Sequence, residues 1–426
     1  MRSKKPFSAG KPTFGIFIAL LLLASAIVPT QAQARKFKVL HAFHGSPTDG
    51  YFPGGQGWLV RDAAGNLYGT AGSGGKGTCG TSTCGTAFKM DRTGKEIWLH
   101  SFNGKDGMGP SGGLLRDAAG NLYGTTFEGG DLRCKLDSLG CGAVFELDPS
   151  GKETVLYRFK GMTDGLFPDS PVVQDASGNL YGTTEVGGSS GFGNVFEVDK
   201  DGKEKSLYSF TGHKDGCYPV GVILDSAGNL YGVAAQGGSA FCNRGQGVLF
   251  KLDTKDNFSV LYTFGGERGS VPDSPLLLDA EGNLYGETAY GGSSTDCPSG
   301  CGAVFQLSPG GVETVLYSFC SLSNCVDGER PGGGLSRDGA GNLYGTTIFG
   351  GSYRNCSQDS CGVVFKLDTS GKETVLHSFT AGKDGANPEQ GVILDSSGAV
   401  YGMTYMGGEL SCEPPSGCGV VFKISP

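Results

Sequence analysis

Short apolar runs alternate with polar turns along almost the whole chain, and the runs come in groups of four. In one group they cover residues 113–116, 121–126, 143–147 and 154–159. The runs are rich in Val, Leu, Phe, Tyr and Thr and are bounded by Gly and Asp, as β-strands are. None of these groups has the hydrophobic periodicity of a helix. The pattern predicts units of four short strands.

The four-strand unit occurs seven times. A segment of the form D-x-x-G-N-L-Y-G marks each copy at intervals of 50 to 59 residues, and the last copy has Ala399-Val400 in place of Asn-Leu. The turn glycines of the copies are Gly65, Gly120, Gly178, Gly228, Gly282, Gly341 and Gly398. Seven such sheets predict an all-β chain folded as a seven-bladed β-propeller of four-stranded antiparallel blades. A β-solenoid is the alternative, although a solenoid needs capping units.

The fourth run of the unit is expected at the outside of its blade. It opens with Lys-Glu in several copies, as at residues 95–96 and 152–153, and such charges suit an exposed edge strand. The chain begins with a lone run of this kind, residues 39–43, and ends with a run of the third kind, residues 420–424. We therefore expect the N-terminal strand to pair with the last blade and close the ring.

Each second run contains a glycine in its interior. A missing side chain within a strand indicates the close approach of another segment, and we expect a neighbouring backbone there. The glycines are Gly69, Gly124, Gly182, Gly232, Gly286, Gly345 and Gly402.

The first 34 residues have the features of a signal peptide. Four basic residues precede an apolar run at residues 14–28, and Ala32-Gln33-Ala34 supplies an A-x-A cleavage site. We expect cleavage after Ala34, which leaves residues 35–426 as a single propeller domain that is secreted, periplasmic or on the cell surface. A retained membrane anchor is the alternative, but the apolar run is short for a span of about 20 residues.

The charge of the chain excludes some classes of partner. The formal net charge is −8 and becomes −12 without residues 1–34, which hold four basic side chains and no acidic ones. Such a surface disfavours nucleic acid and anionic membranes. We expect an extracellular or envelope protein or a glycan as partner, no membrane span in the mature protein, no cofactor, and a monomer.

Two strings of the second repeat carry a resemblance to a known family. GGLLRDAAGNLYGTTFEGG at residues 112–130 and CGAVFELDPSGKETVLYRF at residues 141–159 resemble the GloVer tandem repeat of secreted bacterial proteins. The resemblance covers residues 37–426 and implies export and a β-propeller, without an established activity. The strand order is also similar, more loosely, to NHL-type propellers.

All 14 cysteines follow the leader, an even number that suits disulfides in an oxidising compartment. Six pairs are close neighbours in the sequence: Cys79–Cys84, Cys134–Cys141, Cys297–Cys301, Cys320–Cys325, Cys356–Cys361 and Cys412–Cys418. The remaining Cys217 and Cys242 fall in loops on the same face of a propeller, so we expect them to be bonded to each other. A structural zinc site is the alternative, but the chain has no CxxC motif and no histidine among these cysteines.

Six of the connections between repeats carry an Asp-Gly turn, and the fifth has Glu267-Arg268-Gly269 instead. The turn itself explains the motif, but a ring of carboxylates could also bind a cation or a polyol. The candidate residues are Asp49, Asp106, Asp164, Asp215, Asp327 and Asp384.

Aromatic and basic residues lie in the loops between the second and third runs, where the repeats differ most. Phe241, Arg244, Tyr353 and Arg354 are candidates for sugar or peptide recognition. Three histidines, His41, His100 and His377, occupy a position that holds tyrosine in other repeats, which indicates a structural role. No catalytic set stands out among the residues.

Three function hypotheses follow. The first is an exported binding or scaffold propeller that recognises a protein or glycan through its disulfide-closed loop face. The second is a hydrolase or lyase acting on polysaccharide, and it requires a non-repeated polar cluster converging on the axis. The third is a purely structural component of the cell envelope.

Overall fold

The computed structural model describes residues 35–426 except 46–48, 55–56, 81, 135–137 and 354–360, together with residues 1, 3 and 10. Residues 35–426 form one compact unit. The signal-peptide prediction for residues 1–34, including cleavage after Ala34, falls on a segment that is almost entirely outside the described residues.

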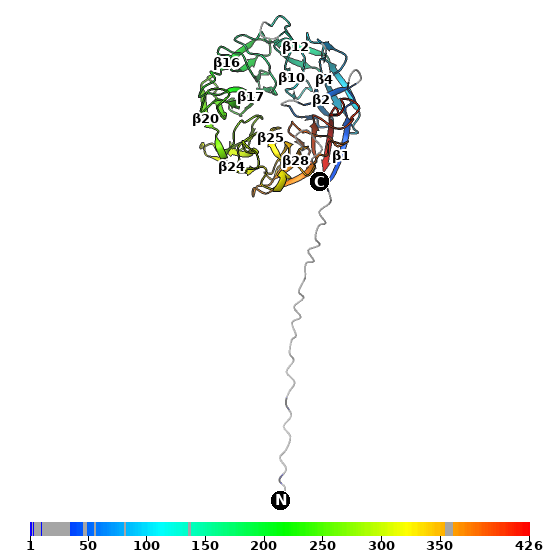
Figure 1. Ribbon diagram of the computed structural model, residues 1–426, viewed down its shortest axis with the longest axis vertical. Helices are drawn as coiled ribbons and strands as arrows, with labels where there is room; N and C mark the ends of the chain where they lie inside the picture. Colours follow the sequence, from blue (N-terminus) through cyan, green and yellow to red (C-terminus); the bar gives the residue numbers. More distant parts are fainter. Residues whose placement is uncertain are drawn as a thin grey trace. The chain divides into compact units, whose positions relative to one another are not determined.

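Seven antiparallel sheets follow one another around a ring, numbered here as blades 1 to 7 in chain order (Figure 1). The first three blades hold thirteen strands. Blade 1 contains β2 (Gly50–Pro53), β3 (Val60–Arg61), β4 (Leu67–Gly74), β7 (Thr86–Met90) and β8 (Glu96–Ser101). Blade 2 contains β9 (Leu114–Arg116), β10 (Leu122–Thr126), β11 (Ala143–Leu147) and β12 (Glu153–Arg158), and blade 3 contains β13 (Val173–Gln174), β14 (Leu180–Thr184), β15 (Asn194–Val198) and β16 (Glu204–Ser209).

The later blades repeat this order. Blade 4 contains β17 (Cys217–Leu224), β18 (Leu230–Gln236), β19 (Val248–Leu252) and β20 (Phe258–Thr263), and blade 5 contains β21 (Leu277–Leu278), β22 (Leu284–Thr288), β23 (Ala303–Leu307) and β24 (Glu313–Ser318). Blade 6 contains β25 (Glu329–Pro331), β26 (Ser336–Arg337), β27 (Leu343–Phe349), β28 (Val363–Leu367) and β29 (Glu373–Ser378). Blade 7 contains β30 (Ile393–Leu394), β31 (Val400–Thr404), β32 (Val420–Ser425) and the N-terminal β1 (Lys36–Ala42).

The expected strand order within a blade is confirmed. The first strand of each blade lies nearest the centre of the ring, as for β2, β17 and β25, whereas fourth strands such as β16, β20 and β24 lie at the rim (Figure 1). We call these the inner and outer strands. A small hairpin of β5 (Thr78–Cys79) and β6 (Ser82–Thr83) and two 3-10 turns, η1 (Gly266–Arg268) and η2 (Ser323–Cys325), complete the described elements.

The predicted closure of the ring is also confirmed. β1 pairs antiparallel with β32, in the sheet order β1-β32-β31-β30, so the two ends of the described unit share one blade (Figure 1). The seven-bladed all-β propeller expected from the sequence is therefore the fold of residues 35–426.

The glycine inside the second strand has a different cause from the one expected. A Cβ atom at Gly124 would lie 2.7 Å from Cζ of Phe145, the residue opposite it on the third strand, and the other six glycines meet the equivalent phenyl ring in the same way. The glycine thus makes room for a ring of its own blade rather than for another backbone. Gly232, which would also meet the carbonyl oxygen of Gly221, is closest to the original expectation.

These phenyl rings join neighbouring blades. Each contacts, edge to face, a phenylalanine at the end of the outer strand of the preceding blade, with ring centroids 5.0 to 5.4 Å apart. The seven pairs are Phe43–Phe88, Phe102–Phe145, Phe159–Phe196, Phe210–Phe250, Phe264–Phe305, Phe319–Phe365 and Phe379–Phe422. Each pair adds about 0.5–1.5 kcal/mol to the effect of burial alone, so the ring has the same apolar contact at all seven junctions.

The aspartate of the D-x-x-G-N-L-Y-G segment holds the hairpin between the first two strands. In blade 3 the Asp175 carboxylate accepts hydrogen bonds from the backbone and side-chain nitrogens of Asn179 and from the Tyr181 hydroxyl. The same set recurs around the ring, which explains the motif as a structural one. Among the described residues, no helix is long and apolar enough to cross a membrane.

Candidate functional site

The six candidate aspartates of the Asp-Gly turns lie beside the outer strands. Each is bonded to a tyrosine hydroxyl or histidine ring of the outer strand just before it, as in Tyr157 to Asp164 at 2.7 Å and His41 to Asp49 at 2.9 Å. The other partners are His100 for Asp106, Tyr208 for Asp215, Tyr317 for Asp327 and His377 for Asp384. Backbone N–H groups also donate to most of these carboxylates. The six therefore bond to the connections between blades and do not converge on one ligand.

Histidine and tyrosine have the same position in these networks, as the alignment of the repeats indicates. The group of His100, Asp106 and Glu153 gathers three possible metal ligands within 4.8 Å. However, the Asp106 carboxylate already bonds the His100 ring at 3.0 Å and the Asn103 backbone and side-chain nitrogens at 2.8 and 2.6 Å. This arrangement is that of a hydrogen-bonded connection between blades.

The glutamates that open the outer strands are not solvent-facing charges, contrary to the reason given for placing those strands outside. Glu96 lies against Asp49 of the preceding connection with a side chain only 11% exposed. Burial, together with the charge of Asp49, raises the pKa of Glu96 to about 9. Burial also raises the pKa of Glu204 and Glu373 to about 7, next to Asp164 and Asp327.

Other junctions replace this carboxyl pair with a different contact. Arg268 takes the place of the aspartate in the fifth connection and lies 3.4 Å from Glu313. At two junctions a phenyl ring replaces the glutamate: Phe258 stacks on Tyr208 with centroids 3.9 Å apart, and Phe37 stacks on His377 at 3.8 Å. The residue at the start of the outer strand thus contacts the neighbouring blade at these junctions, although the contacting side chains differ.

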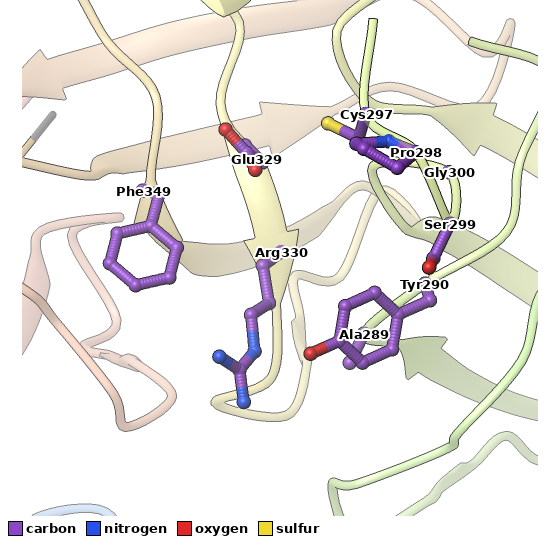
Figure 2. A pocket seen from close by; sticks show the side chains of 9 residues that line it. All are labelled: Ala289, Tyr290, Cys297, Pro298, Ser299, Gly300, Glu329, Arg330 and Phe349. Carbon is purple, nitrogen blue, oxygen red and sulfur yellow. The ribbon is translucent and has the colours of Figure 1, made fainter. Parts of the chain in front are cut away.

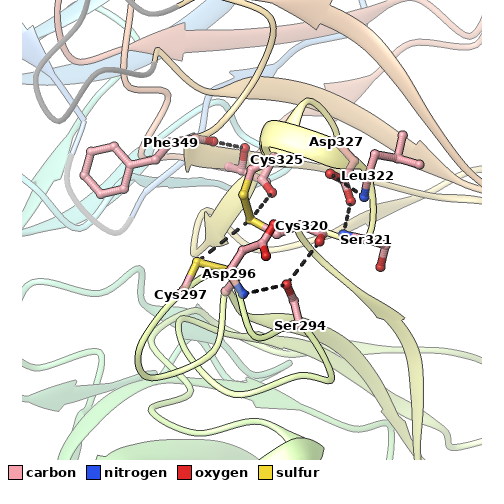
Figure 3. The surroundings of a disulfide bond; sticks show 12 residues. Ser294, Asp296, Cys297, Cys320, Ser321, Leu322, Cys325, Asp327 and Phe349 are labelled. Atoms are coloured by element: carbon pink, nitrogen blue, oxygen red, sulfur yellow. Dashed lines mark hydrogen bonds between the residues drawn. A yellow bond between two sulfur atoms is a disulfide. The ribbon is translucent and has the colours of Figure 1, made fainter.

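Six disulfides join described cysteines: the five local pairs at residues 79–84, 134–141, 297–301, 320–325 and 412–418, and the pair Cys217–Cys242, whose Cα atoms are 6.1 Å apart. Cys361 is disulfide-bonded as well, while its expected partner Cys356 lies outside the described residues. Two of these bonds are neighbours, since Sγ of Cys297 is 3.8 Å from Sγ of Cys320 (Figure 3).

The repeats also differ from one another at the inner strands. A proline lies within or shortly before the inner strand of each blade, and the residue before it has a positive φ in all seven. The residues directly after this proline are Gly54, Ser111, Asp169, Val220, Asp273, Gly332 and Glu389. Blades 3, 5 and 7 therefore place a carboxyl group at a position where the others have small or apolar residues.

These inner carboxyl residues are partly buried, and the charge of Arg330 acts on two of them. Burial raises the pKa of Asp273 to about 7, against the opposing charge of Arg330 from blade 6. Burial also raises the pKa of Glu389, again opposed by Arg330. The charge of Arg330, in blade 6, thus opposes the rise in pKa of a carboxyl group in each neighbouring blade, blade 5 and blade 7.

Burial also raises the pKa of two other acidic groups near the inner strands, Glu287 and Asp169. Glu287 stands on β22 where most blades have Thr, is fully buried, and accepts a hydrogen bond of 2.8 Å from the Gly334 backbone. Burial and the charge of Asp273 raise its pKa to about 8. On blade 3, burial and the charge of Glu185 raise the pKa of Asp169 to about 7.

A pocket of about 270 Å³ lies between blades 5 and 6 at the loop face (Figure 2). The guanidinium of Arg330 lies between two rings, 5.6 Å from the centroid of Tyr290 and 5.9 Å from that of Phe349. The loop from Cys297 to Gly300 forms the opposite wall. Both rings lie within cation–π range of the guanidinium and favour its position there.

In two stacked aromatic pairs, a ring of the inner segment of one blade lies against a ring directly after the second strand of the preceding blade. Phe52 of blade 1 stacks on Tyr405 of blade 7 with centroids 4.7 Å apart, and Phe127 of blade 2 stacks on Phe167 of blade 3 at 4.5 Å. Phe52 and Phe167 occupy the same repeat position as Arg330, directly before the proline. We call Asp169, Asp273, Arg330 and Glu389 with these two aromatic pairs the axial mouth.

The aromatic and basic candidates of the variable loops lie further out. Phe241 is 47% exposed and contacts the rings of Phe192 and His213, and Tyr353 is 46% exposed. The backbone of Arg244 bonds the Phe241 carbonyl. Arg354 lies outside the described residues.

The charged residues of the axial mouth are absent from the candidates derived from the sequence. A signal was available for Glu287, which stands where four of the seven repeats have Thr, whereas the positions of Asp169, Asp273, Arg330 and Glu389 have no common residue in the repeats.

Comparison with known proteins identifies the family. The Gloeobacter/Verrucomicrobia repeat matches residues 78–297 and 293–426. This chain belongs to that family. The GloVer resemblance read from the second repeat is thereby confirmed, and the repeat in question is the blade of a seven-bladed propeller. A search of curated proteins finds no match.

Two solved structures of low sequence identity share the fold. The extracellular domain of the hybrid two-component system BT4673 from B. thetaiotaomicron is 14% identical with a TM-score of 0.53, over 92% of this chain and 42% of that one. A second structure, titled as the one-component system BT4673, gives 15% and 0.51, over 92% and 41%. This chain therefore spans about two fifths of those domains. A gluconolactonase, XC5397 from Xanthomonas campestris, is 12% identical with a TM-score of 0.43, over 92% of this chain and 89% of that one.

Proposed function

We propose that this protein is an exported binding propeller that takes an extracellular glycan at the axial mouth of its loop face. Export is supported by the features of residues 1–34 and by the disulfides, which are typical of oxidising compartments. The argument for binding rests on one observation: charged and aromatic residues that are not part of the repeat gather on the inner strands.

Several axial polar groups have an atom without a hydrogen-bond partner, as do some repeated groups such as Oε1 of Glu96 and Glu204. Among the described residues, Asp273 Oδ1, Glu287 Oε1, Arg330 Nε and Gln390 Oε1 are buried without a hydrogen-bond partner. A buried polar group left unbonded costs about 1–3 kcal/mol. A fold that needed only stability would have apolar residues at these positions, as blade 4 has with Val220 and Val233.

The chemistry of the axial mouth favours a sugar. The faces of aromatic rings bind the apolar C–H faces of pyranose rings, while carboxylates and guanidinium groups bond pairs of neighbouring hydroxyls. The axial mouth offers both kinds of group, on the inner segments and at the ends of two second strands. Disulfides order the surrounding loops before binding, which lowers the entropy lost on association.

A second candidate function is a hydrolase or lyase acting on polysaccharide. It is favoured by a specific observation, the polar axial cluster in which burial raises the pKa of Asp273 to about 7 and also raises that of Glu389. Carboxyl groups that titrate near neutral pH can act as general acids or bases. Cleavage of a glycosidic bond uses two such groups.

The test uses purified protein of residues 35–426 on a glycan array, followed by calorimetry with the best oligosaccharide. We expect Tyr405→Ala to weaken binding about tenfold, equivalent to roughly 1.4 kcal/mol. Tyr353→Ala is the matched control, because Tyr353 is exposed in a loop outside the axial mouth. Thermal unfolding of both variants checks that the fold is intact.

The outcomes separate the hypotheses. Loss of binding in Tyr353→Ala but not Tyr405→Ala would move the ligand to the outer loops. Release of new reducing ends from the bound oligosaccharide, abolished by Asp273→Asn, would establish the enzyme instead. No binding to any glycan would refute the proposal.

A further inference from the structure

We propose that the glycan carries a carboxylate, as a uronic acid does, and that Arg330 binds this carboxylate in the pocket between blades 5 and 6. This inference rests on the proposed function and specifies its ligand class. It depends on which groups the guanidinium of Arg330 contacts and on which of its N–H donors have no partner.

The guanidinium is held in place by aromatic rings rather than by acids. Tyr290 and Phe349 lie on either side of it, and Figure 2 shows its nitrogens directed away from the loop of Cys297 and Pro298. None of the ion pairs within 4.0 Å in the described part of the chain includes Arg330. Its Nε is buried and unbonded among those residues. A planar group with this geometry and unused donors suits bidentate binding of a carboxylate.

The fold does not require an arginine at this position. The equivalent residues of the other blades are Phe52, Gly109, Phe167, Tyr218, Val271 and Asn387, and all of them share the positive φ of Arg330. The backbone conformation thus belongs to the repeat, whereas the charge is particular to blade 6.

Two disulfides fix the backbone around Arg330. Cys297–Cys301 lies in the wall of the pocket, and Cys320–Cys325 lies in the connection that leads into β25. Figure 3 shows the two bonds in contact, with the hydroxyl of Ser294 bonded to the carbonyl of Cys320 at 3.1 Å. Asp327 accepts the backbone N–H of Ser321 at 2.8 Å in the same connection. The guanidinium is therefore presented from an ordered loop, and binding needs little rearrangement.

A singly charged carboxylate fits the surroundings better than a more highly charged anion. Asp273 and Glu389 lie near enough for Arg330 to act on them, and they would repel a dianion such as a phosphate monoester. Uncharged hydroxyls of the same sugar would bond these carboxyls, so one ring can use both kinds of group.

The experiment measures binding of hexamers of galacturonic, glucuronic and mannuronic acid and of their methyl esters, by calorimetry with residues 35–426. Esterification removes the charge and keeps the sugar. We expect at least one free acid to bind about tenfold more tightly than its ester. Arg330→Gln should abolish the preference, so that the ratio of the affinity for the acid to the affinity for the ester falls from about ten to about one. Arg330→Lys should lose most of the preference, since a point charge cannot form the two parallel bonds.

Arg244→Gln is the control, a basic residue of a variable loop outside the pocket, and it should keep the preference. The inference is overturned if Arg330→Gln keeps the preference for the free acid, or if acids and esters bind equally to the unaltered protein. If acids and esters bind equally, or if only neutral glycans bind, the inference fails but the proposed function is retained. If no glycan of any kind binds, both fail.

Discussion

At the scale of single residues, the junctions between blades combine one invariant contact with one variable contact. The phenyl pair is the same at every junction, whereas the position next to it holds Glu–Asp, Glu–Arg or a stacked ring. A buried pair of carboxyls is stable only if one of them is neutral. Stability should therefore depend on pH through glutamates that resemble ordinary surface residues in the sequence.

The first prediction concerns Glu96, whose pKa is raised to about 9 in the folded protein from an ordinary value of 4.5. A raised pKa favours the neutral carboxyl in the folded state, so its stabilising effect is complete below about pH 4.5 and is lost as the pH rises toward 9. Glu204 and Glu373, at about 7, act in the same direction. We expect the free energy of unfolding in urea to fall between pH 5 and pH 9.

Glu96→Gln should reduce this fall, because the amide stays neutral at every pH. Glu281→Gln, at an exposed glutamate of a turn, should leave the fall unchanged. A pH profile of Glu96→Gln parallel to that of the unaltered protein would contradict the assignment. At strongly acid pH the opposite trend is expected, since bonding to His41 lowers the pKa of Asp49 against the effect of burial.

At the scale of elements, β1 is the strand on which the closed ring depends. It supplies the outer strand of blade 7, and Phe43 directly after it contacts Phe88 of blade 1 with centroids 5.4 Å apart. Phe37 near its start stacks on His377 of blade 6. One strand of seven residues therefore contacts three blades.

Deletion of residues 35–44 from a chain of residues 35–426 should open the ring. We expect aggregation or a loss of at least about 3–5 kcal/mol, the usual cost of removing one large buried side chain, because the edge of β32 also becomes exposed. Circular dichroism melting and size-exclusion chromatography measure both effects. Removal of residues 1–34 alone is the control and should have no effect. A deletion variant that unfolds at the same temperature as its parent would disprove closure by β1.

At the scale of the whole molecule, the two faces of the ring carry different structural features. The turns between first and second strands repeat one hydrogen-bonded motif, whereas the opposite face carries the disulfides, the pocket and the axial mouth. Cys217–Cys242 is the disulfide that joins a connection between blades to a loop of blade 4.

Peptide mapping without reduction should recover Cys217 and Cys242 in one linked fragment, and reduction should separate it. The bond closes a longer loop than the local pairs, 25 residues against 4 to 7. The double variant Cys217→Ser/Cys242→Ser should therefore lose about 3 kcal/mol of stability by chain entropy. Either cysteine recovered free, or joined to one of the local pairs, would contradict the placement of these two loops on one face.

Much of this fold could be predicted because its determinants are local and repeated. The D-x-x-G turn, the apolar runs and the complementary ends of the chain each act within one unit or between neighbouring strands, so seven copies state the same pattern seven times. Closure by residues 39–43 followed from counting strands alone.

The axial mouth could not be derived in that way, since Asp169, Asp273, Arg330 and Glu389 are separated by between 57 and 104 residues in the chain. A carboxyl on one inner strand meets a guanidinium on another only when the ring is closed, and burial there changes its pKa. The pKa of Glu96 also depends on packing between blades, because the sequence alone suggests a surface charge and only the neighbouring blade buries it. Local hydrogen bonding and strand periodicity are encoded in the sequence of each repeat, whereas desolvation and the meeting of distant charges exist only in the closed ring, because both depend on which blades pack side by side.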